Sequence, residues 1–155
     1  MWLFLTIISA LLYSSLVEYC LHRFALHHSP KQIHITNHHK KFHGIKSYQL
    51  SKVNSVDVVS SKKYILSNIL LALPISLIIS TLNIYLGILF ITISIVYTLW
   101  VEYLHYYFHK SNNATLEKLK FFQRLKEHHR VHHYIYNSNY GMATRFWDKV
   151  FRTKR

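Results

Sequence analysis

Residues 64–101, YILSNILLALPISLIISTLNIYLGILFITISIVYTLWV, contain no charged side chain. A helix needs about 20 mostly apolar residues to cross the hydrocarbon of a bilayer, so this run is too long for one span and suits two. The polar residue Asn83 falls near the middle of the run, where a tight turn is expected. We predict two membrane-spanning helices, roughly over residues 64–82 and 84–108.

A second uncharged run opens the sequence. Residues 1–17 contain no charged side chain. A secretory signal is the alternative explanation, but the run lacks a basic region before it and an evident small-residue cleavage site after it. We therefore predict a third spanning helix, roughly over residues 1–21. The expected fold is an all-α membrane protein in which residues 1–155 form a single domain.

The basic residues all fall on one predicted side of the membrane. Eight Lys and Arg lie in residues 22–63 and eleven in residues 110–155, which together make up all 19. The positive-inside rule predicts that this side is cytoplasmic, facing the cytosol from the endoplasmic reticulum or from a bacterial inner membrane. The net charge of +13 is explained by this topology and by attraction to an anionic membrane surface, so we predict no nucleic-acid partner.

All 13 histidines lie in four clusters within these basic segments. The clusters are HRFALH (22–27, followed by His28), HITNHHKKFH (34–43), HYYFH (105–109) and HHRVHH (128–133). Neutral imidazole is a good ligand for zinc, iron, copper and nickel, and histidines kept for packing would not sort by topology. Because each ion takes only about four to six ligands, so many imidazoles predict two metal ions, held in a helical cap.

Two details of these clusters carry further expectations. His22 and His27 are five residues apart, which is awkward for one face of an α-helix, so we expect the helix to loosen before Ser29. Glu18 and Glu102 precede the first histidine of their clusters by about one turn. We expect each carboxylate to accept the second N–H of that imidazole.

The segment before the last cluster predicts an amphipathic helix. Apolar residues recur at every third position from Leu116 to Leu125, with basic residues between them. Such a helix suits the membrane interface, and its apolar stripe continues into His129, His132 and His133. A short aromatic helix is expected after it, around residues 146–151.

The four clusters, read with the tail NYGMATRFWDKVF (139–151), resemble the histidine boxes and the ending of the integral-membrane fatty acid hydroxylase/sterol desaturase superfamily. The resemblance covers residues 18–43 and 101–152. It implies a histidine-bound centre of two metal ions, with iron expected and zinc as an ion that purification can introduce. It also implies dioxygen, a lipid substrate taken from the bilayer, and a separate electron donor, either a cytochrome-type haem protein or a ferredoxin-like protein.

Carried over box by box, the resemblance assigns ten metal ligands. They are His22, His27, His34, His38, His39, His105, His109, His129, His132 and His133. Six more residues are expected around these ligands: Glu18, Glu102, His28, His43, His128 and Asp148. Two features depart from the family pattern: three residues, where two are common, separate His34 from the next histidine, and the chain has three predicted spans where relatives often have four.

Hydroxylation of a fatty acyl chain is the expected reaction, because the first box and the tail look most like that branch. A sterol or carotenoid hydroxylase or desaturase of the same superfamily is the alternative. A metal transporter or a protein with a structural zinc site is the non-catalytic alternative. Transporters place polar ligands near the bilayer midplane, and structural zinc sites need only four ligands, so neither matches this pattern.

Overall fold

Three long helices dominate the computed structural model, which describes residues 1–28, 34–43, 48–49, 58, 62–110 and 114–155. They are α1 (Trp2–Cys20), α3 (Lys62–Leu82) and α4 (Ile84–His109). Each is long and apolar enough to cross a membrane, and the described ranges contain no strand. The prediction of an all-α membrane protein with about three spans is confirmed.

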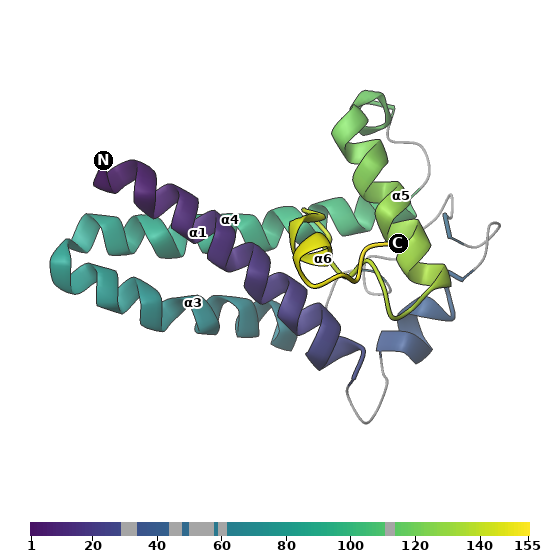
Figure 1. Cartoon of the computed structure of the whole chain (residues 1–155), viewed down its shortest axis with the longest axis horizontal. Coiled ribbons are helices and arrows are strands. Elements are labelled where there is room, and N and C mark those ends of the chain that lie inside the picture. Colours follow the sequence, from purple (N-terminus) through teal and green to yellow (C-terminus); the bar gives the residue numbers. More distant parts are fainter. Residues whose placement is uncertain (29–33, 44–47, 50–57, 59–61, 111–113) are drawn as a thin grey trace.

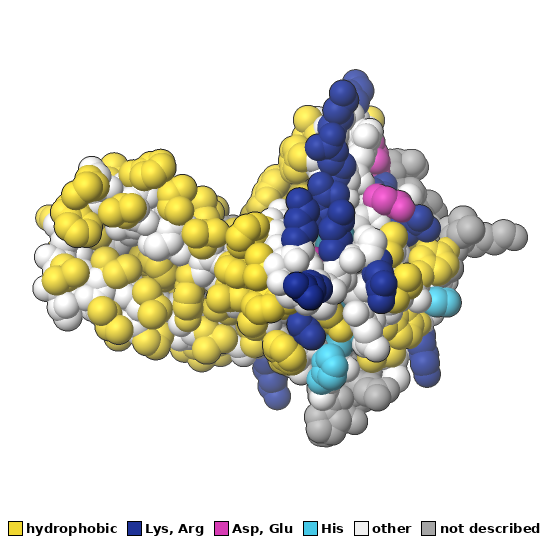
Figure 2. Space-filling model, viewed as in Figure 1, with side chains coloured by type: hydrophobic (Ala, Val, Ile, Leu, Met, Phe, Trp, Pro, Cys, Tyr) yellow, Lys and Arg dark blue, Asp and Glu magenta, His cyan; other side chains and the backbone are white. Residues whose placement is uncertain are grey.

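The helices form an elongated bundle with a cap at one end (Figure 1). α1 packs against α4 and α3, and the remaining helices gather where α1 and α4 end. Figure 2 shows apolar side chains over the bundle and Lys and Arg side chains over the cap. An apolar surface of this extent is typical of a lipid-facing bundle, since soluble proteins rarely expose large apolar patches.

Small and polar side chains hold the three helices together. Asn83 caps α4 by accepting hydrogen bonds from the backbone N–H groups of Tyr85 and Leu86, which confirms the expected turn. Between α1 and α4, Ser14 Oγ donates to Ser94 Oγ over 3.0 Å. Such small-residue contacts let helices approach closely where lipid removes the hydrophobic driving force.

Helices α3 and α4 approach closely at Gly87, whose carbonyl accepts a 2.8 Å hydrogen bond from Ser76 Oγ. A Cβ at this position would overlap Ser80 Oγ and lie 2.7 Å from the Ser76 carbonyl oxygen. We expect Gly87→Ala to lower the free energy of unfolding by about 1–3 kcal/mol, the usual cost of overpacking. Thermal unfolding in lipid nanodiscs measures this, with Ile88→Ala on the exposed face as the control. Equal shifts for the two variants would contradict it.

The cap is built from segments that precede and follow the α3–α4 hairpin in the sequence. α1 continues into a π-helical turn, η1 (Leu21–Leu26), and a second π-helical turn is η2 (Ile35–His39). A 3-10 turn, η3 (Leu116–Lys118), leads into α5 (Lys120–Tyr134), and the tail carries α6 (Phe146–Val150). The helix therefore loosens already at residue 21, and Ser29 itself lies outside the described residues.

The amphipathic helix differs from its prediction in two ways. It is interrupted at Leu119, which has extended backbone angles, so the first turn is separate from α5. Phe122 and Leu125 are buried in a cluster with Leu104 and Phe108 of α4. This part of the apolar stripe is therefore used to dock α5 on the end of α4, where the sequence predicted contact with the membrane interface.

Candidate metal centre

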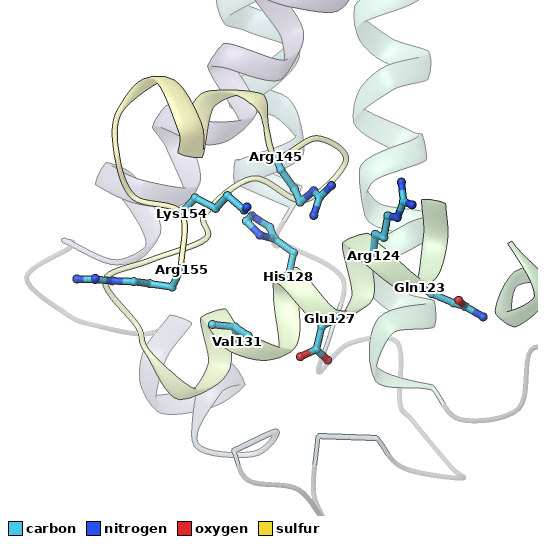
Figure 3. A pocket seen from close by; sticks show the side chains of 8 residues that line it. All are labelled: Gln123, Arg124, Glu127, His128, Val131, Arg145, Lys154 and Arg155. Atoms are coloured by element: carbon cyan, nitrogen blue, oxygen red, sulfur yellow. The ribbon is translucent and has the colours of Figure 1, made fainter. Parts of the chain in front are cut away.

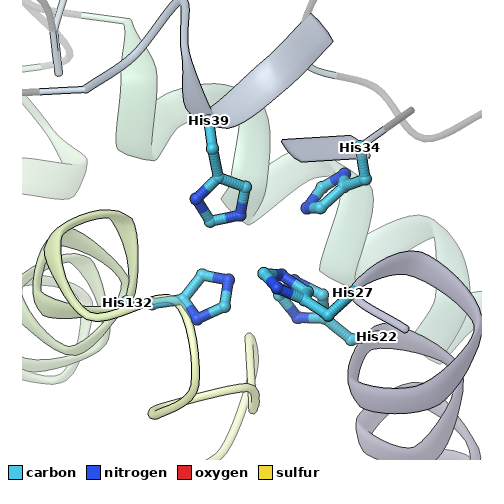
Figure 4. A group of neighbouring side chains, drawn as sticks. All are labelled: His22, His27, His34, His39 and His132. Atoms are coloured by element: carbon cyan, nitrogen blue, oxygen red, sulfur yellow. The ribbon is translucent and has the colours of Figure 1, made fainter. Parts of the chain in front are cut away.

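The ten histidines predicted as ligands converge on two sites where α1, α4, α5 and η2 meet. Histidine group A contains His22, His27, His34, His39 and His132 (Figure 4). Histidine group B contains His38, His105, His109, His129 and His133. Within each group, one ring nitrogen from every residue lies within 4.8 Å of the others.

Helix type decides which group receives a histidine pair. In a π-helix the i→i+5 hydrogen bond brings residues five apart onto one face. His22 and His27 are linked in this way by a 3.2 Å backbone hydrogen bond, and their rings lie 5.1 Å apart. The pair His34 and His39 uses η2 in the same manner, with ring centroids 4.9 Å apart. Both five-residue pairs therefore supply group A.

The pairs with four-residue spacing supply group B from regular α-helices. They are His105 with His109 on α4 and His129 with His133 on α5, with ring centroids 5.2 and 4.7 Å apart. Residues four apart share an α-helical face, so each pair reaches one site. The three residues between His34 and His38, where two are common in the family, are thus accommodated by the π-helical turn η2.

Adjacent histidines are divided between the groups. His38 and His132 lie next to His39 and His133, and successive helical residues point about 100° apart, so each member of a pair serves a different group. The rings of His39 and His133 stack with centroids 4.2 Å apart, which joins group A to group B. The two candidate ions would therefore be neighbours in one centre.

Unpartnered nitrogen atoms indicate that group A fits a metal ion. Within the described chain, ten buried ring nitrogens have no hydrogen-bond partner, and no other type of buried side-chain atom shares this condition. All ten belong to members of groups A and B. Leaving one buried polar atom unpaired costs about 1–3 kcal/mol, so a fold that retained ten would be strongly destabilised without a ligand. Each imidazole offers one nitrogen to an ion, so an ion in group A would satisfy five of these atoms, one on each of its histidines.

The spacing of the nitrogens in group B also suits metal ions. The Nε2 atom of His129 lies 3.1 Å from the Nε2 atoms of both His109 and His133. His38 and His105 bring their Nε2 atoms to 3.0 Å. Imidazole nitrogens bound at about 2.0–2.1 Å to one ion are separated by about 3 Å, which matches these contacts.

Burial keeps four imidazoles of groups A and B that lie outside the spans neutral. Loss of solvent lowers the pKa of His27 to about 2, and the neighbouring imidazoles add to this effect. Burial likewise lowers the pKa of His39, His132 and His133 far below the usual value of about 6.5. A neutral imidazole has a free lone pair, which is the state that binds a metal.

Backbone carbonyls orient three of the imidazoles. The Nδ1 atoms of His22 and His132 each lie 2.6 Å from a carbonyl oxygen, on Tyr140 and Ser138 respectively. His109 Nδ1 lies 2.9 Å from the carbonyl oxygen of Tyr48. Donation from Nδ1 leaves Nε2 as the ligand atom. Sequence reasoning missed these partners because carbonyls of irregular segments carry no side-chain signal.

The expected contacts of Glu18 and Glu102 with histidines are wrong. The buried Glu18 carboxylate accepts from the Met142 backbone N–H over 3.1 Å and from the Tyr97 hydroxyl over 3.5 Å. His105 Nδ1, the atom expected to reach Glu102, has no hydrogen-bond partner among the described residues. A separation of one α-helical turn does not bring Glu18 to His22, because the His22 Nδ1 atom contacts the Tyr140 carbonyl of the tail.

Asp148 is the buried anchor of that tail. Its carboxylate accepts hydrogen bonds from the backbone N–H groups of Tyr140 and Gly141, both over 2.8 Å, and from Thr153 Oγ1 over 2.7 Å. His128 Nε2 contacts it at 3.0 Å. Burial alone would raise the pKa of Asp148, but these hydrogen bonds outweigh it and the pKa is lowered. Asp148 thus fixes the backbone whose carbonyl orients His22.

Replacing Asp148 with asparagine is therefore expected to destabilise the protein by about 1.5–3 kcal/mol, the usual contribution of a hydrogen bond to a charged group, because the amide nitrogen cannot accept from the backbone N–H groups that share the carboxylate. The matched control is Glu127→Gln on the same helix as His128, because Glu127 pairs with Arg130 at the exposed surface. Such surface pairs contribute about 0–1 kcal/mol. Thermal unfolding of the two variants should separate them clearly, and similar losses would show that Asp148 is not an anchor.

Three histidines lie outside both groups. His128 faces Asp148 and is buried. His43 Nδ1 lies 3.1 Å from the His133 carbonyl oxygen, and His28 Nδ1 lies 2.6 Å from the Arg23 carbonyl oxygen. His28 and His43 are exposed. Among the described residues, His43 contacts His133 of group B and His128 contacts Asp148, whereas His28 contacts the Arg23 carbonyl and the Phe24 ring of η1.

Comparison with known proteins agrees with this geometry. The family model described as fatty acid hydroxylase matches residues 7–153. The match begins within α1, spans α3 and α4, and includes all ten histidines of groups A and B. No curated protein and no solved structure matches the chain.

Proposed function

The chain belongs to the fatty acid hydroxylase family, and on this basis we propose that it hydroxylates a fatty acyl chain at a centre of two iron ions. The family is one of membrane-bound hydroxylases and desaturases that depend on metal. The observation that carries the proposal is the convergence of ten buried histidines into two adjoining groups of five. No packing or hydrogen-bonding role explains so many unpartnered nitrogens.

Each histidine group would hold one ion. Five imidazoles leave a coordination position open on an ion that accepts six ligands, and imidazole suits iron. When bound, the two ions would supply the activation of dioxygen and the oxidation of a C–H bond. Bound zinc alone would not exclude iron as the working metal, because purification exchanges ions.

The residues of the chain would fix the ligands and exclude water. The carbonyls of Tyr140, Ser138 and Tyr48 hold three imidazoles in the tautomer that binds metal. Groups A and B contain no carboxylate, so the positive charge of two ions would need compensation nearby. The buried carboxylates of Glu18, Glu102 and Asp148 are suited to provide it.

The position of the centre suits a lipid substrate. Histidines of both groups lie at the ends of α1 and α4, two of the candidate membrane spans. An acyl chain could therefore reach the centre from the bilayer without crossing water. The concentration of Lys and Arg on the cap supports a cytoplasmic location, where a soluble or membrane-bound electron donor would supply the two electrons.

Expression in a lipid-producing host tests the proposal. Iron and an electron donor are supplied, and the host lipids are compared with those from a His132→Ala, His133→Ala variant. We expect fatty acids that have gained one oxygen atom only with the unaltered chain. A new double bond, or a modified sterol or carotenoid, would contradict acyl hydroxylation and support the alternative reaction. If no modified lipid is found, the proposed enzyme activity is refuted. Metal uptake into vesicles would then favour a transporter.

A further inference from the structure

A basic pocket lies between α5 and the tail, on the face of α5 opposite its metal-binding histidines (Figure 3). Its volume is about 370 Å³. Four cationic side chains line it: Arg124, Arg145, Lys154 and Arg155. The pocket is separate from groups A and B, and the proposed metal chemistry gives it no role.

The positive charge of this pocket is not neutralised by the protein. Among the residues that the structure describes, none of the four cationic side chains has an ion-pair partner. Glu127 also lines the pocket, but Arg130 holds its carboxylate with two hydrogen bonds of 2.6 and 2.7 Å. The pocket therefore favours an anion.

The contacts that the tail makes with α1 place this pocket next to the bilayer. Trp147 Nε1 donates to Ser15 Oγ of α1 over 2.9 Å, and the Phe151 ring stacks on Tyr19 with centroids 5.3 Å apart. Both α1 residues precede Arg23, the first basic residue of the chain. At 1.5 Å per residue, Ser15 lies about 12 Å to the bilayer side of Arg23. The tail thus packs along the part of α1 that would lie in the membrane.

Exposed apolar side chains on α6 support this depth. Phe146 and Val150 on α6 and Phe151 directly after it are each about half exposed, between Arg145 and Lys154. Apolar and aromatic side chains flanked by basic ones are typical of segments that insert at the membrane surface. The pocket is therefore placed where lipid headgroups are concentrated.

We propose that this pocket binds the phosphate group of an anionic phospholipid from the adjoining leaflet. Arg guanidinium groups suit phosphate oxygens because they present several N–H donors in one plane. The lipid would join α5 to the tail at Arg145 and Lys154. It would thereby steady the tail segment whose Ser138 and Tyr140 carbonyls orient His132 and His22.

Native mass spectrometry of the full chain tests this, after reconstitution in nanodiscs of phosphatidylcholine with a minority of phosphatidylglycerol. The variant is Arg145→Gln, Lys154→Gln. The control is Lys118→Gln, Lys120→Gln, which removes the same charge from exposed residues outside the pocket. About five-fold is expected per lost charge, so the variant should bind phosphatidylglycerol about 25-fold more weakly while the control retains it. If the double variant fails to fold, Arg124→Gln on the exposed face of α5 replaces it.

Three results would overturn the proposal. Equal retention of phosphatidylglycerol by the unaltered chain, the variant and the control would mean that diffuse charge attraction, and not the pocket, binds the lipid. Displacement of the lipid by inorganic phosphate at equal concentration would make the pocket a site for free phosphate. Unchanged lipid retention with lost capture of an acidic redox protein would assign the pocket to a protein partner.

Discussion

Replacing His132 with alanine is expected to reduce the rate of lipid hydroxylation by more than about 100-fold. His132 is fully buried, belongs to group A and is oriented by the Ser138 carbonyl. Residues that only orient a metal ligand are worth about 10- to 100-fold, so losing a ligand should cost more. The measurement is product formed per mole of reconstituted enzyme with a fixed electron donor.

The control is His28→Ala, the same chemical change at a nearby position. His28 is exposed, and among the described residues its Nδ1 atom contacts the Arg23 carbonyl, so the variant should keep most of its activity. The resemblance to the family placed this residue near the ligands, and the structure places it at the surface. Equal losses in the two variants would mean that the assay reports general damage to the cap instead of metal binding.

Removing metal is expected to lower the thermal unfolding temperature by at least about 10 °C. Without its ion, group A leaves five more buried nitrogens unpaired at about 1–3 kcal/mol each, and 1 kcal/mol corresponds to about 2–4 °C for a chain of this size. Structural zinc sites show that metal binding can supply most of the folding free energy of a small domain. Unfolding is followed with and without a membrane-compatible chelator.

The metal-free protein should also lose stability as the pH falls through the ordinary range of histidine. Burial holds the pKa of His27, His39 and His132 below that of the unfolded chain. Below about pH 6.5 these histidines bind protons in the unfolded state and stay neutral in the folded state, so acid favours unfolding. The double variant His132→Ala, His133→Ala should respond less to the chelator. An unfolding temperature unaffected by chelation would contradict this account of the centre.

The spans could be predicted from the sequence because the requirement is local. An uncharged run of sufficient length must cross the bilayer as a helix, and Asn83 marks the turn between two such runs. The structure gives α3 and α4 the bounds Lys62–Leu82 and Ile84–His109, within two residues of the prediction. The convergence of the four histidine clusters followed from the same topology, although their roles as ligands remain predictions.

The division of the histidines into groups could not be predicted in this way. It depends on the π-helical turns η1 and η2, whose hydrogen bonding has no distinct residue signal. The five-residue spacings of His22 with His27 and of His34 with His39 are the sequence features that accompany these turns. The contact of Glu18 with Met142, 124 positions away, was equally hidden, because it depends on how the tail folds back over α1.

The number of metal ions per chain tests the central claim most directly. Elemental mass spectrometry of the unaltered chain should find two ions. His39→Ala in group A and His105→Ala in group B should each leave one ion, because each substitution removes a ligand from a single group. An unaltered chain that binds only one ion, or variants of both groups that retain two, would contradict the assignment of one ion to each histidine group.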